Sequence, residues 1–339
     1  MGYNLARYFR QRGHSVTVLD SLVRAGSETN IPSLRRMGIP FLRGDVRLKG
    51  DVFQLRNCEV ILDCAAQPSA IAGDADPEAD FQHNILGTFH VLELARQCGL
   101  GVVFWSTNKV YSGDKVNKVE SERKGDRWQW WTEPHRTYGL NEDFPLDGGD
   151  KSVYGVSKVA GDLLCQEYAS AFNLPVWINR CSCLAGKYQW GKPEQGWVAW
   201  FVIAGLFNLP VELFGWQGCQ LRDVLFVDDL ALLVEKQLQQ MSSAKGQVFN
   251  VGGGPSVGFQ SSPLELVKLV EELIGSPMTY TVSEAVRRAD HRIYVSDIRK
   301  VKERFGWSPT ISVRQGVEDI LRWARENEGT LRALYAGGS

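Results

Sequence analysis

Short apolar runs alternate with helical patterns through the first half of this 339-residue chain. The runs Val16–Asp20, Pro40–Asp45, Val60–Ala65 and Val102–Ser106 are short and rich in apolar residues. Runs of this kind are typical of strands that are covered on both faces, as in a parallel sheet. Between the last two runs, Asn84–Cys98 repeats apolar residues at the three- and four-residue spacing of an amphipathic helix. The alternation predicts a doubly wound α/β parallel sheet.

The pattern continues for one more helix and strand and then changes. Gly155–Phe172 predicts a helix and Pro175–Cys181 a strand, and after residue 182 the sequence becomes rich in Gly and Trp. The later elements are more dispersed: Gln247–Val251, Pro263–Ile274 and Val313–Asn327. We therefore expect a nucleotide-binding domain over residues 1–181. A smaller α/β substrate lobe is expected over residues 182–339, with some of its segments returning to the first domain.

Composition excludes several classes of function. Lys and Arg (38) nearly balance Asp and Glu (39), so neither nucleic acid nor an anionic membrane is expected as a partner. No apolar run approaches the ~20 residues that cross a bilayer, and the N-terminus lacks the apolar block of a secretory signal. The seven cysteines form no CxxC pair, and the five histidines are scattered, so we expect reduced thiols, no metal site and a cytoplasmic location.

Two aspartates end predicted strands. A dinucleotide-binding sheet places an acidic residue at the end of its second strand, where the carboxylate accepts hydrogen bonds from the adenosine ribose. Asp20 closes the first apolar run and suits this role, which favours NAD over NADP because a carboxylate repels a ribose phosphate. Asp45, which precedes Val46, is a candidate for contact with the adenine edge. An ordinary turn aspartate is the alternative at both positions, and it is the stronger alternative for Asp45.

A tyrosine and a lysine four residues apart carry the clearest chemical signal. Tyr154 and Lys158 share one face of the predicted helix, and an ammonium group near a phenol favours the phenolate form, which makes tyrosine usable as a general base. A YxxxK pair alone is common by chance. Here it opens an amphipathic helix, and the string STNKVY (Ser106–Tyr111) supplies hydroxyl groups at the end of a predicted strand. Together these motifs favour one shared catalytic site.

The chain resembles the NAD-dependent epimerase/dehydratase family of extended short-chain dehydrogenases. The general resemblance rests on VTVLD (Val16–Asp20), CAAQ (Cys64–Gln67), NILGT (Asn84–Thr88), STNKVY, YGVSK (Tyr154–Lys158) and QLRDVLFVDDL (Gln220–Leu230). Within the family, the CDP-paratose 2-epimerases are the most similar group, on the strings STNKVY, FPLDG (Phe144–Gly148), QGWVAWF (Gln195–Phe201) and YVSDIRK (Tyr294–Lys300). The resemblance implies a Rossmann-like fold, NAD as cofactor, a nucleotide-diphosphate sugar as substrate and a homodimer.

The resemblance also implies roles for single residues. Thr107 would hydrogen-bond the substrate, Tyr154 would be the base, and Lys158 would lower the tyrosine pKa and hold the nicotinamide ribose. The expected cofactor-binding residues are Gly2, Asp20, Asp45, Val46, Ala65, Ala66, Gln67, Asn84, Tyr154 and Lys158. The expected substrate-binding residues are Thr107, Asn108, Asn179, Gln195, Trp197, Gln220, Arg222 and Arg287.

Arginine suits a diphosphate because its guanidinium group forms forked hydrogen bonds. A surface salt bridge is the alternative role for Arg222 and Arg287, and Arg288 competes with Arg287 for the position.

The sequence departs from the family pattern at its beginning. Family members carry a strand and a G-x-x-G-x-x-G turn before the first helix, whereas here Gly2 alone remains of that turn. Without the turn, the pyrophosphate lacks backbone N–H donors, and the strands beside the missing one lack partners. We expect a start that lies too far downstream, or a fragment, rather than a degenerate relative.

Two further departures concern the substrate. Ala185–Gln189 reads AGKYQ where relatives read YGPRQ, which leaves the details of the substrate loop open. The cluster Trp128–Trp131 is unusual, and it could cap a sugar, pack internally or form a subunit contact.

The residues after Thr107 decide between the reactions known in the family. Family dehydratases carry Asp-Glu there as acid and base, and this chain has Asn108-Lys109, which disfavours 4,6-dehydration. Epimerisation remains: a sugar carbon is oxidised transiently with NAD and re-reduced on its opposite face. Similarity to the CDP-paratose 2-epimerases implies C2 of a CDP-sugar.

Two alternatives stay open. A UDP-sugar 4-epimerase would use the same residues, and only product analysis separates it. A non-catalytic, N-terminally truncated sugar-nucleotide-binding protein is the alternative from another class. Upstream codons that encode a strand and a GGxGFxG turn would exclude it, and a stop codon there would favour it.

Overall fold

The computed structural model describes residues 1–335, which form two compact units. The first unit comprises residues 1–110, 153–180 and 231–249, and the second comprises residues 111–152, 181–230 and those from 250 onward. Residues 111–152, which the sequence-based boundary assigned to the first domain, cluster with the second unit. Residues 231–249 return to the first unit.

The first unit contains two sheets. The larger sheet has the strand order β11-β7-β4-β3 and consists of β3 (Val60–Asp63), β4 (Gly101–Thr107), β7 (Val176–Cys181) and β11 (Val248–Val251). The smaller sheet pairs β1 (Val18–Asp20) with β2 (Phe41–Arg43) in parallel. The four strands expected in the first half are therefore confirmed, with bounds that differ by one to two residues at most ends. Within residues 1–335 no strand joins β1 to β3, so the two sheets remain separate.

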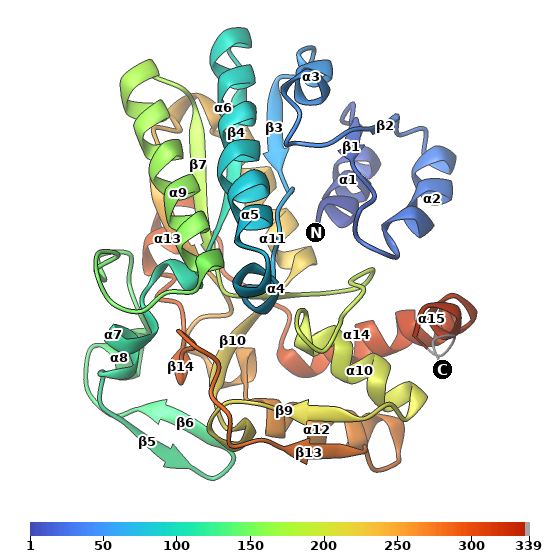
Figure 1. Cartoon of the computed structure of the whole chain (residues 1–339), viewed down its shortest axis with the longest axis vertical. Coiled ribbons are helices and arrows are strands. Elements are labelled where there is room, and N and C mark those ends of the chain that lie inside the picture. Colours follow the sequence, from blue (N-terminus) through green and yellow to red (C-terminus); the bar gives the residue numbers. More distant parts are fainter. Residues whose placement is uncertain (336–339) are drawn as a thin grey trace. The chain divides into compact units, whose positions relative to one another are not determined.

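Helices connect these strands (Figure 1). The helical segments of the first unit are α1 (Gly2–Gln11), η1 (Ser27–Asn30), α2 (Ile31–Arg36), α3 (Lys49–Val52), η2 (Phe53–Leu55), α4 (Ala70–Ala75), α5 (Pro77–Asp80), η3 (Phe81–Leu86), α6 (Gly87–Cys98), η4 (Asn108–Val110), α9 (Val153–Phe172), α11 (Val227–Gln239, which begins in the second unit) and η6 (Met241–Ser243). The expected single helix over residues 84–98 is divided, because its first residues belong to the π-helical turn η3.

The larger sheet is covered on both faces, as the doubly wound prediction requires. Val176 and Ile178 of β7 belong to the hydrophobic cluster that also includes residues of α6 and α9. The alternate residues Trp177 and Asn179 face α11, where the Trp177 Nε1–H donates to the carbonyl of Gln237 (2.9 Å). Successive side chains of a strand point to opposite faces, so β7 lies between two helical layers. The first unit therefore has a Rossmann-like α/β fold.

The second unit is built around β10. In its main sheet β10 (Leu221–Phe226) lies between β12 (Gln260–Ser261) and β14 (Ile293–Tyr294), and β8 (Cys183–Ala185) also pairs with it. Two smaller sheets pair β5 (Ser121–Lys124) with β6 (Arg127–Trp130), and β9 (Val211–Leu213) with β13 (Tyr280–Val282). The helical segments are α7 (Gly113–Asn117), α8 (His135–Tyr138), α10 (Trp197–Phe207), η5 (Trp216–Gly218), η7 (Val257–Phe259), α12 (Pro263–Ile274), α13 (Arg299–Phe305), α14 (Val313–Glu326) and α15 (Glu328–Tyr335).

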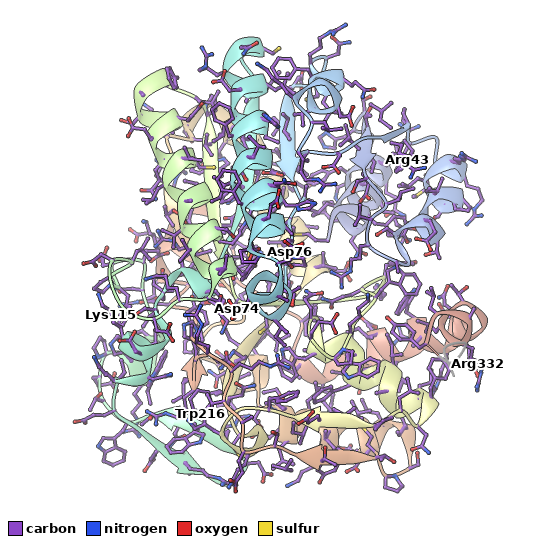
Figure 2. All side chains as sticks on the ribbon, in the orientation of Figure 1. Arg43, Asp74, Asp76, Lys115, Trp216 and Arg332 are labelled. Atoms are coloured by element: carbon purple, nitrogen blue, oxygen red, sulfur yellow. The ribbon has the colours of Figure 1, made fainter. Side chains whose placement is uncertain are left out.

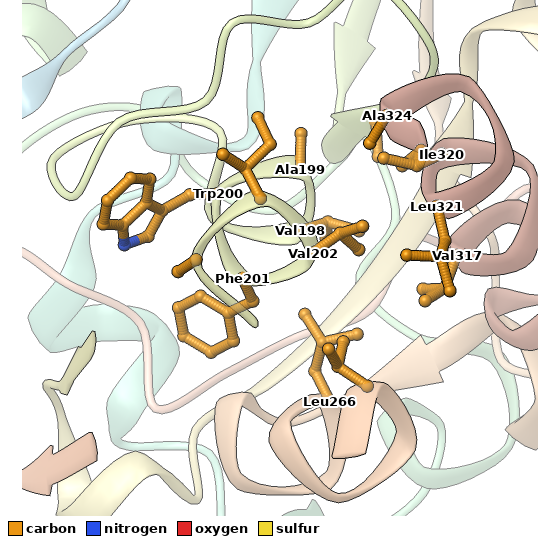
Figure 3. Packing of buried hydrophobic residues seen from close by; sticks show 14 of the residues in the cluster. Val198, Ala199, Trp200, Phe201, Val202, Leu266, Val317, Ile320, Leu321 and Ala324 are labelled. Atoms are coloured by element: carbon orange, nitrogen blue, oxygen red, sulfur yellow. The ribbon is translucent and has the colours of Figure 1, made fainter. Parts of the chain in front are cut away.

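The core of the second unit surrounds α10, whose residues are almost all apolar. Figure 3 shows Val198 and Val202 of α10 directed toward Val317 of α14, and Leu266 of α12 belongs to the same cluster. Both partner helices begin with a capping box, at Ser262 and Ser312 respectively, which satisfies backbone N–H groups that have no partner within the helix. Within residues 1–335 no helix combines the length and the apolar character needed to cross a membrane.

Candidate active site

Thr107 is the last residue of β4, whose seven residues are all buried. Its hydroxyl Oγ1 donates to Asn108 Oδ1 (3.3 Å) and accepts from the backbone N–H of Lys109 (3.4 Å). Both distances are long for hydrogen bonds of these types, so this hydroxyl is held weakly. The polar end of a fully buried strand thus presents a hydroxyl group and an amide, without a carboxylate next to them.

Helix α9 packs against β4 and η4 and carries Tyr154 and Lys158 one turn apart. Tyr154 is half-buried, whereas the Lys158 side chain is only 4% exposed, and its Nζ lies 4.2 Å from the centre of the Phe104 ring. The close approach of α9 to the strand depends on Gly161, where an added Cβ would lie 2.8 Å from Phe104 Cζ. A small residue at this position therefore lets α9 lie close to β4.

A buried carboxyl group accompanies this lysine. Asp63 ends β3, the strand next to β4, and burial raises its pKa to about 6, although the charge of Lys158 and the N–H of Ala65 oppose the shift. An ammonium group and a carboxyl group thus share the apolar interior at the carboxyl ends of adjacent strands. The sequence motifs did not single out Asp63, because it lies inside the run that predicts a strand over residues 60–65 and not at its end.

The loop after β3 is joined to the π-helical turn η3 by an amide pair. The Asn84 side chain accepts from the backbone N–H of Gln67 (2.9 Å) and donates to its carbonyl (3.0 Å). The same Nδ2 lies 2.9 Å from Ser157 Oγ, and Ser157 in turn donates to the carbonyl of Tyr154 (2.8 Å). Expected cofactor residues and the first turn of α9 are therefore parts of one hydrogen-bonded network.

The other expected cofactor residues lie around the carboxyl ends of β1, β2 and β3. The Asp20 side chain is exposed and accepts from the N–H of Leu22 (2.7 Å), while Asp45 pairs with Arg47 (2.7 Å), whose hydrogen bonds lower the pKa of Asp45. The remaining positions are near these ends. The carbonyl of Val46 accepts from His90 Nδ1 (2.9 Å), and a Cβ on Gly2 would lie 3.3 Å from Cys64 Cβ. Ala65 is half-buried and Ala66 is exposed.

This set of groups fits a dinucleotide at its two ends. Asp20 offers an exposed carboxylate for ribose hydroxyl groups, and Lys158 offers a buried ammonium group on α9, one helical turn after Tyr154. No glycine-rich phosphate loop of the family type occurs within residues 1–335.

The expected diphosphate arginines differ in their surroundings in the second unit. Arg222 is buried, and its guanidinium donates to Asp290 Oδ1 (2.9 Å), to Gln220 Oε1 (3.2 Å) and to the carbonyl groups of Leu221 and His291. Arg287 is half-buried over the Phe214 ring (4.4 Å), and burial lowers its pKa, a penalty that a bound anion would reduce. Its competitor Arg288 is exposed and pairs with Asp150 (3.0 Å).

The remaining expected substrate residues are scattered over both units. Asn179 is buried in the first unit, and its amide exchanges two hydrogen bonds with Gln237 (3.1 and 2.8 Å). In the second unit, the backbone of Gln195 forms a bridge with Lys192, and Trp197 Nε1 donates to Cys183 Sγ (3.5 Å).

The tryptophan cluster Trp128–Trp131 does not form one surface. Trp130 is buried and lies next to His135, Trp128 is covered by the Arg292 guanidinium, and Trp131 is 55% exposed.

A strained turn before Gln220 was not anticipated from the sequence. Four successive residues, Gly215, Trp216, Gln217 and Gly218, have positive φ angles (70°, 47°, 60° and 74°). Non-glycine residues rarely adopt this conformation, and each costs on the order of 1–3 kcal/mol. Trp216 is labelled in Figure 2. Gly215 and Gly218 could have indicated a turn at this place. Nothing in the sequence indicates that Trp216 and Gln217 also have positive φ angles.

Comparison with known proteins gives consistent matches. The profile of the family described as NAD dependent epimerase/dehydratase matches residues 1–252. CDP-paratose 2-epimerase of Salmonella typhi is 34% identical over 95% of this chain and 96% of that protein. Among solved structures, a dTDP-glucose 4,6-dehydratase from Streptomyces venezuelae with NAD bound is 26% identical (98% of this chain and 96% of that chain covered), with a TM-score of 0.80. A UDP-glucose 4-epimerase of Thermus thermophilus in complex with NAD is 28% identical (94% and 95% covered), with a TM-score of 0.73.

Proposed function

The chain belongs to the NAD dependent epimerase/dehydratase family, and on this premise we propose that it is an NAD-dependent epimerase of a nucleotide-linked sugar, inverting C2 of a CDP-sugar. The proposed substrate class rests on the 34% identity to CDP-paratose 2-epimerase and on the resemblance of the strings around Thr107 and Trp197 to that group.

The observation that carries the choice of reaction is the pair of residues after Thr107. Asn108 is buried and Lys109 is half-buried, and neither can act as a carboxylic acid. Loss of water from a sugar needs an acid and a base at this place, whereas epimerisation asks of the side chains only the removal and return of one hydroxyl proton, with the hydride transferred to and from bound NAD. The absence of a carboxylate at both positions therefore supports epimerisation over dehydration.

The proposed mechanism assigns proton handling to residues of the first unit. Bound NAD would supply the hydride acceptor and donor, which no protein side chain can provide. Tyr154 would take the proton from the sugar hydroxyl, and the Lys158 ammonium would stabilise the resulting phenolate. Thr107 would hydrogen-bond the same sugar oxygen and hold it during the reaction. Tyr154 would then return the proton to the product oxygen after the ketone has presented its other face.

Product analysis by NMR tests the proposal. The protein loaded with NAD is incubated separately with CDP-paratose, CDP-glucose and UDP-glucose. Inversion at C2 of a CDP-sugar supports the proposal. Inversion at C4 of the UDP-sugar would identify the rival 4-epimerase reaction. The absence of turnover with NAD bound would contradict both reactions.

We also propose that the enzyme is a homodimer, formed through α6 and α9. These helices pack against each other, and between them they expose apolar side chains: Phe89 (39%), Val156 (54%), Leu163 (51%) and Phe172 (52%). Exposed apolar residues that gather on adjacent helices support a protein interface.

A further inference from the structure

Asp80 is a buried carboxylate that the roles assigned above do not use. It ends α5 directly before the π-helical turn η3, and its side chain is 0% exposed. Oδ1 accepts from Gln67 Nε2 (3.0 Å) and from Asn84 Nδ2 (2.9 Å), whereas Oδ2 has no hydrogen-bond partner among residues 1–335. Buried charged groups are normally paired or fully hydrogen-bonded, so this half-satisfied carboxylate calls for an explanation.

The carboxylate determines which way two amides face. An ionised carboxylate only accepts hydrogen bonds, so both Gln67 and Asn84 must turn their NH₂ groups toward Asp80. In that orientation Asn84 Oδ1 can accept from the backbone N–H of Gln67 (2.9 Å), and Gln67 Oε1 can accept from the N–H of Ser69 (2.6 Å). Asp80 thereby fixes the backbone at residues 67–69, directly after the expected cofactor residues Ala65 and Ala66.

The same network reaches the helix that carries the proposed base. Asn84 Nδ2 lies 2.9 Å from Ser157 Oγ, and that hydroxyl donates to the carbonyl of Tyr154 (2.8 Å). Reversal of the Asn84 amide would place an oxygen against both Asp80 and Ser157, so the carboxylate also stabilises this contact. Two hydrogen-bonded side chains therefore separate Asp80 from the first turn of α9.

Packing holds the carboxylate in place from the other side. A Cβ on Gly73 would lie 1.8 Å from Asp80 Oδ2 and 3.2 Å from Gln67 Nε2. No other side chain can occupy that position without displacing the carboxylate. A glycine at residue 73 is thus part of the same arrangement.

We propose that Asp80 is a positioning residue: its carboxylate orients the Gln67 and Asn84 amides and so sets the loop at residues 65–69 and the first turn of α9. The consequence for cofactor binding rests on the function proposed above, whereas the orientation of the two amides does not.

The charges around Asp80 make this device sensitive to acid. Burial raises the pKa of Asp80 to about 6; the Gln67 hydrogen bond and the Lys158 charge lower it, and Asp74 and Asp76 raise it further. Asp74 lies in α4 and Asp76 directly after it, and both are labelled in Figure 2. Protonation of Asp80 removes its charge and makes Oδ1 a weaker acceptor for the two NH₂ groups, so the loop should loosen as the pH falls through about 6.

Hydrogen exchange of the NAD-free protein tests the proposal without any turnover. In Asp80→Ala, and independently in Gly73→Ala, we expect the rate of backbone amide hydrogen exchange at residues 66–69, where every residue except Pro68 has an N–H, to rise about tenfold. This factor is the scale of one hydrogen bond to a charged group. Exchange of β4 should stay unchanged, and NAD should bind about tenfold more weakly by calorimetry. Asp74→Asn, which removes a neighbouring charge, is the matched control and should exchange at residues 66–69 like the parent protein.

The pH dependence separates positioning from a general structural role. Corrected for intrinsic rates, exchange at residues 66–69 should rise below pH 6 in the parent protein, and Asp80→Asn should lack this step. The proposal is overturned if both Asp80→Ala and Gly73→Ala leave exchange at residues 66–69 within twofold of the parent. It is also overturned if exchange rises equally in β4, since that would indicate only lost stability. A failure to epimerise any sugar would leave these readouts intact and would count against the proposed function alone.

Discussion

Tyr154 and Lys158 lie on the same face of α9 but differ in how far they are buried. Tyr154 is half-buried and Lys158 is 4% exposed, so the lysine charge lies in an interior where electrostatic interactions are stronger than in water. A buried ammonium group one helical turn from a partly accessible phenol suits the role proposed for Tyr154.

We expect Tyr154→Phe to lower kcat by about 10²–10⁴-fold, the usual contribution of a general base. The melting temperature should change little, because the ring is kept. Tyr168→Phe is the matched control: this tyrosine lies on the same helix and its hydroxyl bonds to Glu93 (3.0 Å), so kcat should stay near that of the parent. Steady-state kinetics with the substrate identified by product analysis provides the measurement, and near-normal turnover by Tyr154→Phe would rule out the assigned role.

Asp63 predicts how stability depends on pH. Its pKa is raised from 3.8 to about 6, so the folded protein binds the proton more tightly than the unfolded chain. The stabilisation from this group is therefore complete below pH 4 and is lost as the pH rises through 6; it amounts to roughly 3 kcal/mol at most. Asp63→Asn should remove this dependence, so that the difference in melting temperature between variant and parent grows from pH 4 to pH 7. A difference that is constant over this range would refute the raised pKa.

At the scale of elements, α9 is tied to two strands by a buried ion pair. Asp162 accepts from Arg180 of β7 (2.9 and 3.2 Å) and from the hydroxyl of Ser106 in β4 (2.6 Å), and both charged side chains are almost fully buried. Asp162 follows Lys158 by one helical turn, so the link lies directly beside the proposed catalytic residues.

Removal of this carboxylate should be strongly destabilising. Asp162→Ala leaves the Arg180 charge buried without its partner, and we expect a loss of about 3–5 kcal/mol in the free energy of unfolding. Gln166→Ala removes only a neutral donor to Asp162 (2.7 Å) and should lose less, about 1.5–3 kcal/mol, because no charge is left unpaired. Urea titration of both variants provides the comparison, and equal losses would show that the buried charge is not what matters.

Sequence periodicity predicted the elements that depend on local pattern. The runs that became β3, β4 and β7 are short and mostly apolar, which favours strands that are covered on both faces. The π-helical turn at Phe81–Leu86 was not predicted from the sequence, because one extra residue in a helical turn barely alters the spacing of apolar residues.

Contacts between residues far apart in the sequence were not predicted for a different reason. Arg222 and Asp290 are 68 residues apart, and Gly73 and Asp80 matter to each other only once α4 and α5 have folded. Tyr154 and Lys158 could be named from the sequence because their motif fits within one helical turn, but the buried carboxyl groups of Asp63, Asp80 and Asp162 could not.

At the scale of the whole molecule, the proposed dimer makes a clear prediction. Leu163→Glu places a charge on the exposed face of α9 and should shift the mass in solution toward the monomer, because burial of an unpaired charge is unfavourable. Leu48→Glu, at another exposed leucine (58%) of the first unit, should leave the mass unchanged. Light scattering coupled to size-exclusion chromatography measures both, and a parent protein that is monomeric at micromolar concentration would contradict the proposal.

The chain passes between the two units at residues 110/111, 152/153, 180/181, 230/231 and 249/250. Neither unit is therefore one continuous stretch of sequence, and a single recombination event could not transfer either of them whole. A chimaera that takes its second unit from a relative needs three grafted stretches with matched junctions, and a single-crossover library would mostly yield mismatched interiors. Changes of substrate in such a chain should accumulate one side chain at a time, within a scaffold inherited as a whole.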